Sequence, residues 1–118
     1  MRLLIVGINP AKGGPKIKGA LSRLSCWMDA IGVKHWSFTN CIFNPGPYSY
    51  KDVDFKHLSH CTNGYDKVVA LGGFPSRALT ELGIDHHVLP HPSGLNRNLN
   101  DKDYEKAQVK KCKEYIYG

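Results

Sequence analysis

Short runs of apolar residues recur along the chain, and four of them have the length and composition of β-strands. Two runs are continuous: Met1–Val6, which Gly7 ends, and Lys67–Leu71. Such runs are typical of strands buried on both faces of a sheet. Trp36–Ile42 is rich in aromatic and β-branched residues, which favour strands, and His86–Leu89 is a short fourth run.

Between the predicted strands, apolar residues return every three or four positions, which is the spacing of a helix that packs on one side. The predicted helices run from Ala20 to a stop at Gly32, over Val53–Cys61, from about Pro75 to Leu82, and from a cap at Asn100 to about Tyr117. Strands that alternate with helices predict an α/β fold. We expect one domain over residues 1–118, a three-layer α/β/α architecture with a mostly parallel four-stranded sheet.

The composition agrees with one ordinary folded domain, since 42% of the 118 residues are hydrophobic and 22% are charged. No apolar run is long enough to span a bilayer, and the first residues lack the pattern of a secretory signal. We therefore expect a cytoplasmic protein without a membrane partner. The net charge of +6 favours an anionic partner such as nucleic acid, and a merely soluble basic surface explains it as well.

The cysteines give little support to a metal site. The four of them are irregularly spaced and form no CxxC pair, so a zinc ribbon or an iron–sulfur cluster is not indicated. The segment His57–Cys61 places donor atoms close together, but no second half of a site follows it. We expect free thiols, no metal and no cofactor.

Two loops that follow predicted strands hold the residues with the most evident chemistry. The first is Gly7–Ala11, at the start of a stretch rich in glycine, proline and lysine, and the second is His91–Arg97. Ligands of parallel α/β sheets bind beyond the carboxyl ends of the strands. Both loops are therefore expected at a ligand-binding edge.

Four segments resemble, in the same order, motifs of the uracil-DNA glycosylase superfamily. They are GINP at 7–10, FTNC at 38–41, VVALGG at 68–73 and HPSGLNR at 91–97. GINP and PSGL are most similar to the mismatch-specific uracil/thymine branch, whereas His91 is more typical of other branches. The resemblance implies a uracil-DNA glycosylase-like fold and a monofunctional, base-flipping DNA glycosylase. Such an enzyme hydrolyses the N-glycosidic bond of uracil or a related modified pyrimidine.

The resemblance also implies roles for single residues. As catalytic residues, Asn9 orients the attacking water and His91 donates a hydrogen bond to the departing base. Asn40 reads the edge of the pyrimidine through its side-chain amide, and Ile8 and Pro10 complete the base-binding site.

DNA, the expected partner of a monomeric protein, is contacted through both loops. Leu95, preceded by Gly94, resembles the wedge that fills the space left by an extruded base. The other expected DNA contacts are Ser93 and Arg97 at flanking phosphates and Lys12, Lys16 and Lys18 beside the first motif.

The sequence departs from the family where a base-stacking aromatic residue is usual. Residues 16–21 contain no aromatic ring, which leaves Phe43 or Tyr48 as alternative sources of stacking. Ala11 replaces a glycine that is common after GINP. Each motif residue also has a structural explanation taken alone: Asn9–Pro10 is a common turn, and Leu95 can pack against the core.

A second hypothesis is therefore a catalytically degenerate DNA- or nucleotide-binding module of the same fold. A third moves the glycosidic chemistry to a free nucleoside or nucleotide.

Overall fold

The computed structural model describes residues 1–10, 20–92 and 97–118. Within these residues the chain forms an α/β fold whose single sheet has four strands, in the order β2-β1-β3-β4, and every strand pair is parallel. The strands are β1 (Leu3–Gly7), β2 (Ser37–Asn40), β3 (Lys67–Leu71) and β4 (His87–Leu89). The α-helices are α1 (Ala20–Ile31), α2 (Phe55–Thr62), α3 (Gly73–Glu81) and α4 (Lys102–Tyr117). Short 3-10 turns, η1 (Tyr50–Asp52) and η2 (Arg97–Asn100), precede α2 and α4.

The predicted strands and helices are confirmed, and their ends differ from the prediction for local reasons. Helix α3 begins at Gly73 rather than at Pro75, because proline is tolerated in a first helical turn. Helix α4 is capped by Asp101, and the expected cap at Asn100 is wrong. The Asp101 carboxylate accepts hydrogen bonds from the backbone N–H groups of Asp103 (2.9 Å) and Tyr104 (3.2 Å). Asn100 lies in η2 instead.

Strand β2 is shorter than the predicted Trp36–Ile42 because it lies at the edge of the sheet and pairs only with β1. Beyond it, Cys41 and Ile42 still donate backbone hydrogen bonds to Gly7 (3.0 Å) and Ile8 (2.9 Å). The two chains thus continue side by side past the end of the sheet.

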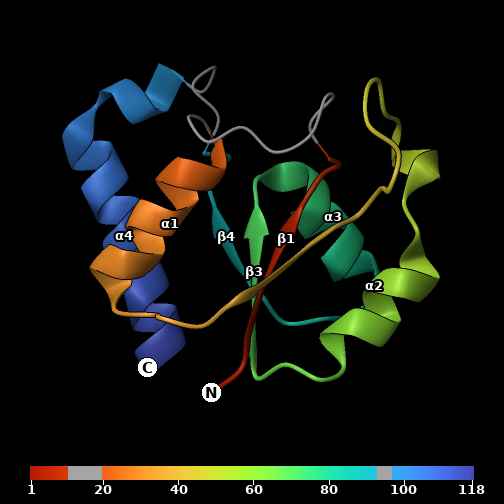
Figure 1. The fold of residues 1–118 in the computed structure, drawn as a ribbon, viewed down its shortest axis with the longest axis horizontal. Coiled ribbons are helices and arrows are strands. Elements are labelled where there is room, and N and C mark those ends of the chain that lie inside the picture. The colour runs from red at the N-terminus through yellow and green to blue at the C-terminus, as the bar shows by residue number, and fades with distance from the viewer. Residues whose placement is uncertain (11–19, 93–96) are drawn as a thin grey trace.

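Helices cover both faces of the sheet, with α1 and α4 on one side and α2 and α3 on the other (Figure 1). The alternation of side chains along the strands divides the core accordingly. Leu3 and Ile5 of β1 pack towards α1 and α4, a side that we call the α1/α4 face. Leu4 and Val6 pack towards α2 and α3, on the α2/α3 face.

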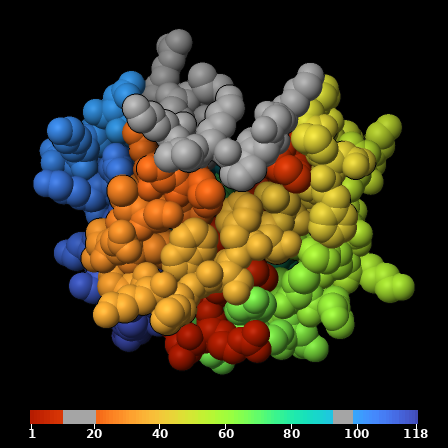
Figure 2. All heavy atoms as spheres, in the orientation of Figure 1, coloured from red at the N-terminus to blue at the C-terminus, as the bar shows by residue number. Residues whose placement is uncertain are grey.

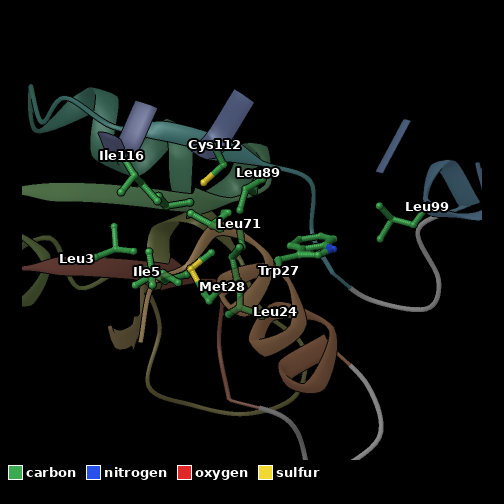
Figure 3. Packing of buried hydrophobic residues seen from close by; sticks show 13 residues of the cluster. Leu3, Ile5, Leu24, Trp27, Met28, Leu71, Leu89, Leu99, Cys112 and Ile116 are labelled. Atoms are coloured by element: carbon green, nitrogen blue, oxygen red, sulfur yellow. The ribbon is translucent and has the colours of Figure 1, made fainter. Parts of the chain in front are cut away.

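The cluster on the α1/α4 face joins both helices to β1, β3 and β4 (Figure 3). It includes Leu24 and Met28 of α1 and Cys112 of α4, all of them at most 1% exposed. Trp27 of α1 adds a polar tie, because its indole N–H donates a 2.8 Å hydrogen bond to the Glu105 carboxylate of α4. The layers around the sheet therefore hold the strand ends in fixed relative positions.

None of the helices in the described ranges is both long and apolar enough to cross a membrane.

Candidate functional site

All four strands end at one edge of the sheet, which we call the carboxyl edge. The chain leaves β1 towards α1 on one face and leaves β3 towards α3 on the other. Because β1 and β3 are neighbours, the direction in which the chain leaves the sheet changes between them, which makes this point the topological switch point of the sheet. Ligands of open α/β sheets bind at such a switch point, so a site is expected at this edge.

Asn9 follows β1 at this edge, and its side-chain amide ties two loops together. Its Nδ2 donates hydrogen bonds to the backbone carbonyls of Asn44 (3.2 Å) and Gly46 (2.9 Å), in the loop after β2. Two carbonyl acceptors fix which end of the amide carries the N–H groups. The Oδ1 atom accepts no hydrogen bond from any described residue, so it can accept one from a bound water.

Asn40 ends β2, and its side chain leans over the last residue of β1. A Cβ placed on Gly7 would lie 2.8 Å from the Asn40 Oδ1 atom, a distance that real Cβ atoms essentially never show. Glycine at position 7 is thus required for the amide to occupy this place. No described residue hydrogen-bonds to the half-buried Asn40 side chain, which leaves one acceptor and two donors for a ligand.

His91 follows β4, and its backbone and Cβ lie beside the end of β3. A Cβ placed on Gly72 would lie 3.7 Å from the His91 Cβ and 3.9 Å from its backbone nitrogen. Gly72 has a φ of +95° and a ψ of 179°, a conformation open almost only to glycine. Burial lowers the pKa of His91, so its imidazole is neutral near pH 7 and carries one N–H donor.

Each of the two side chains lies beside a glycine at the end of a neighbouring strand. Asn40 starts on β2 and reaches β1, while His91 starts after β4 and packs against the end of β3. Asn9 follows β1, which lies between β2 and β3 in the strand order, and neighbouring strands are about 4.8 Å apart. An amide with an open acceptor, a second amide and a neutral imidazole therefore all follow or end strands at the carboxyl edge.

The other expected base-binding residues have plain structural positions. Ile8 is half-buried, and its carbonyl accepts the hydrogen bond from the backbone N–H of Ile42. Its backbone therefore holds the loop after β1 beside the loop after β2. Pro10 is half-buried at the end of the first described range.

Most of the expected DNA contacts fall outside the described residues; these are Lys12, Lys16, Lys18, Ser93, Gly94 and Leu95. Arg97 begins η2, and only its backbone is described.

Phe38 lies within the FTNC motif but was not among the expected site residues. It lies two positions before Asn40 on β2, and the residue is 42% exposed although it is apolar. The Cζ atom lies 2.8 Å from the position of a Cβ on Gly7, next to the Asn40 amide. The signal was available, because alternation along a strand puts both side chains on one face.

The expected stacking alternatives, Phe43 and Tyr48, are engaged elsewhere. The Phe43 ring contacts the His57 ring edge-on with centroids 4.5 Å apart, and the Tyr48 ring contacts Phe74 in the same way at 5.0 Å. His57 and Phe74 belong to α2 and α3, so both aromatic contacts are made to the helices of the α2/α3 face.

A cluster of Thr39, His57 and Cys61 lies on the α2/α3 face, behind Asn40. Thr39 Oγ1 is 2.9 Å from His57 Nε2, whereas the Cys61 sulfur is 3.5 and 3.4 Å from the two ring nitrogens. A sulfur equally close to both nitrogens lies over the ring, so this contact is packing rather than a hydrogen-bonded nucleophile and base. Among the described residues, no three His, Cys, Asp or Glu side chains are placed to hold a metal ion.

Ser76 and His86 form a second serine–histidine contact, at 2.8 Å. The His86 Nδ1 is 2.8 Å from the Ile84 carbonyl, which assigns the proton to Nδ1 and makes Nε2 the acceptor of the Ser76 hydroxyl. His86 precedes β4, so the pair ties α3 to the start of that strand, away from the carboxyl edge.

Comparison of the chain with protein-family models, with curated proteins and with solved structures found no match in any of the three.

Proposed function

We propose that this protein is a DNA N-glycosylase of uracil-DNA glycosylase-like fold, and that it hydrolyses the bond between deoxyribose and uracil or a related modified pyrimidine. The observation that carries the proposal is that Asn9, Asn40 and His91 follow or end strands β1, β2 and β4 at the same edge of the parallel sheet, with the Asn40 amide beside Gly7 and His91 beside Gly72. The order of the four motif segments along the chain supports it.

The reaction breaks the bond between the sugar C1′ and the base nitrogen, and the electron pair of that bond leaves with the base. A water oxygen then bonds to C1′ and one of its protons is released, while the base, which leaves as an anion, takes up a proton from solvent. The products are an abasic site and a free pyrimidine. No lysine is required for this hydrolysis, and no strand cleavage follows from it.

Each residue has a part that fits its geometry. The Asn9 Oδ1 accepts a hydrogen bond from the water, and the amide is held in place because its two N–H groups are bound to backbone carbonyls. An amide is too weak a base to take the proton, so it positions water rather than activates it. The neutral His91 imidazole donates its N–H to a carbonyl oxygen of the base, where negative charge develops.

The test is base release from labelled oligonucleotides that contain uracil, hydroxymethyluracil or thymine, single-stranded and mismatched. His91→Ala removes the donor to the developing charge, and loss of one such donor lowers rates by about 100- to 1000-fold. Asn9→Ala is expected to abolish base release as well, with thermal unfolding measured alongside because the amide also ties two loops.

Matched controls replace the same residue types away from the carboxyl edge. His60 and Asn63 are exposed, in α2 and at its C-terminal end, so His60→Ala and Asn63→Ala should leave base release unchanged. A folded wild-type protein that binds DNA and releases no base from any of these substrates refutes the enzyme and favours the binding module.

A further inference from the structure

Phe38 is an exposed apolar residue that belongs to neither hydrophobic core cluster of the described residues. Its strand β2 is an edge strand, and in Figure 2 the chain around β2, coloured between orange and yellow, lies at the surface between α1 and the α2 side of the molecule. Phe38 is absent from the cluster that α1 and α4 form with the sheet, and 42% of it is exposed. No aromatic contact is made by Phe38 within the described ranges.

The absence of a side chain on Gly7 lets the ring lie beside the Asn40 amide, which makes no hydrogen bond to any described residue. The Phe38 Cζ and the Asn40 Oδ1 atoms each lie 2.8 Å from the position that a Cβ on Gly7 would occupy. The two atoms are therefore no farther apart than twice that distance. An apolar flat surface and an uncommitted amide thus lie side by side over one glycine.

Such a pair suits a planar heterocycle that carries a carbonyl next to an N–H. The face of the heterocycle stacks on a phenyl ring, and its polar edge pairs with both the acceptor and the donors of an amide. We infer that Phe38 and Asn40 together bind the pyrimidine ring of the substrate, Phe38 by stacking and Asn40 by reading its imide edge. This inference rests on the proposed function for the identity of the substrate, and it supplies the aromatic ring that residues 16–21 lack.

Stacking makes a prediction that hydrogen bonding alone does not. Uracil and 5,6-dihydrouracil share the same imide edge, but the ring of dihydrouracil is saturated at two carbons and is no longer flat. Stacking of a base on an aromatic side chain corresponds to about 10- to 100-fold in affinity. The wild-type protein should therefore bind uracil more tightly than dihydrouracil.

The test is titration of the full chain with free uracil and with dihydrouracil, followed by NMR at the Asn40 side-chain amide. Phe38→Leu should weaken uracil binding about 10- to 100-fold and leave dihydrouracil binding nearly unchanged, whereas Phe38→Tyr should preserve the preference for uracil. Phe43→Leu is the matched control, because Phe43 is 54% exposed but packs on His57, and it should behave as the wild type.

The outcomes separate this inference from the proposed function. If uracil is preferred through Phe38 but no base is released from DNA, the pyrimidine site stands and the glycosylase does not. If DNA is cleaved at the glycosidic bond and Phe38→Leu changes neither KM nor the preference for uracil, the stacking role is refuted. A Phe38→Leu effect on sedimentation at increasing protein concentration, without any effect on uracil binding, refutes it too and makes β2 a self-association edge.

Discussion

The two halves of the carboxyl edge are built differently around their glycines. In the β1/β2 half, Gly7 is needed for space, because Asn40 and Phe38 fill the volume of its missing side chain. In the β3/β4 half, Gly72 is needed for its backbone conformation, with a φ of +95° and no contact closer than 3.7 Å. One glycine therefore makes room for neighbouring side chains and the other sets the path of the chain, and substitutions should tell the two apart.

The largest expected effect is on the β3/β4 half. Gly72→Ala forces a side chain into a conformation that essentially only glycine adopts, so we expect a loss of up to about 3 kcal/mol in the free energy of unfolding. Denaturant unfolding measures it. Gly73→Ala is the matched control, since position 73 has a negative φ, lies in the first turn of α3 and has open space around it. Equal stability of the two variants would contradict the conformational role.

The second-largest effect is expected from a substitution of Asn9, whose side chain connects two loops in the β1/β2 half. Asn9→Asp keeps the shape of the side chain but sets a carboxylate against the carbonyls of Asn44 and Gly46. We expect a loss of about 1–3 kcal/mol in the free energy of unfolding near pH 7, from two lost hydrogen bonds.

The carbonyl oxygens raise the pKa of the new carboxyl group in the folded protein. Stability should therefore return as the pH falls through that pKa and the carboxyl group gains a proton to donate. Unfolding free energies at pH 7 and pH 4, with Asn63→Asp as the exposed control, test this. A loss that is the same at both pH values would assign the effect to something other than the charge.

The difference between the halves also explains what the sequence could predict. Runs such as Leu3–Gly7 and Lys67–Leu71 carry their own signal, because strands buried on both faces are continuously apolar, and the alternation of strands and helices then predicts the layered sheet. The ends of β1 and β4 were predicted to form a ligand-binding edge because ligands of parallel α/β sheets bind beyond the carboxyl ends of the strands.

The sequence alone did not predict contacts between segments that are far apart in the chain. The residues around Asn9 in the sequence are typical of a turn. They do not predict its hydrogen bonds to Asn44 and Gly46, which follow a different strand. The role of Phe38 likewise depends on Gly7, a residue of another strand, being small. The helix cap at Asp101 was missed because Asn100 and Asp101 are both good capping residues, and local sequence does not choose between them.

A smaller, pH-dependent effect is expected from the outer strand of the β3/β4 half. The Nε2 atom of His87 is buried without a hydrogen-bond partner among the described residues, and its ring stacks on Tyr115 with centroids 5.3 Å apart. Burial, followed by the charges of His86 and Lys111, lowers the pKa of His87. The Lys67 ammonium on the same Tyr115 ring, 4.8 Å from its centroid, adds no opposite charge.

Because the folded protein resists protonation of His87 while the unfolded chain accepts it, stability is complete above about pH 6.5, the ordinary histidine value. Stability should fall as the pH drops from there through the lower folded pKa, and the lowered pKa of His91 acts in the same direction. His87→Leu should reduce this decline, as measured by thermal unfolding at pH 7.5 and pH 5. If His60→Leu, at an exposed position of α2, flattens the curve equally, His87 is not its source.

The smallest effect on stability should accompany a clear effect on recognition. In Gly7→Ala the new methyl group meets only the ends of two flexible side chains, Asn40 and Phe38. Both can move into solvent, so the free energy of unfolding should change by no more than about 0.5 kcal/mol. The ring and the amide are then pushed apart, and binding of free uracil should weaken as it does in Phe38→Leu.

Gly7→Ala combined with Phe38→Leu sharpens the comparison, because the smaller side chain returns part of the space to Asn40. If the ring and the amide bind one ligand, the double variant should bind uracil no more weakly than Phe38→Leu alone, since the stacking that the methyl group disrupts is already absent. A double variant whose losses simply add would show that Gly7 acts elsewhere. A Gly7→Ala protein as unstable as Gly72→Ala would show that both glycines serve the backbone, and the distinction between the two halves would be lost.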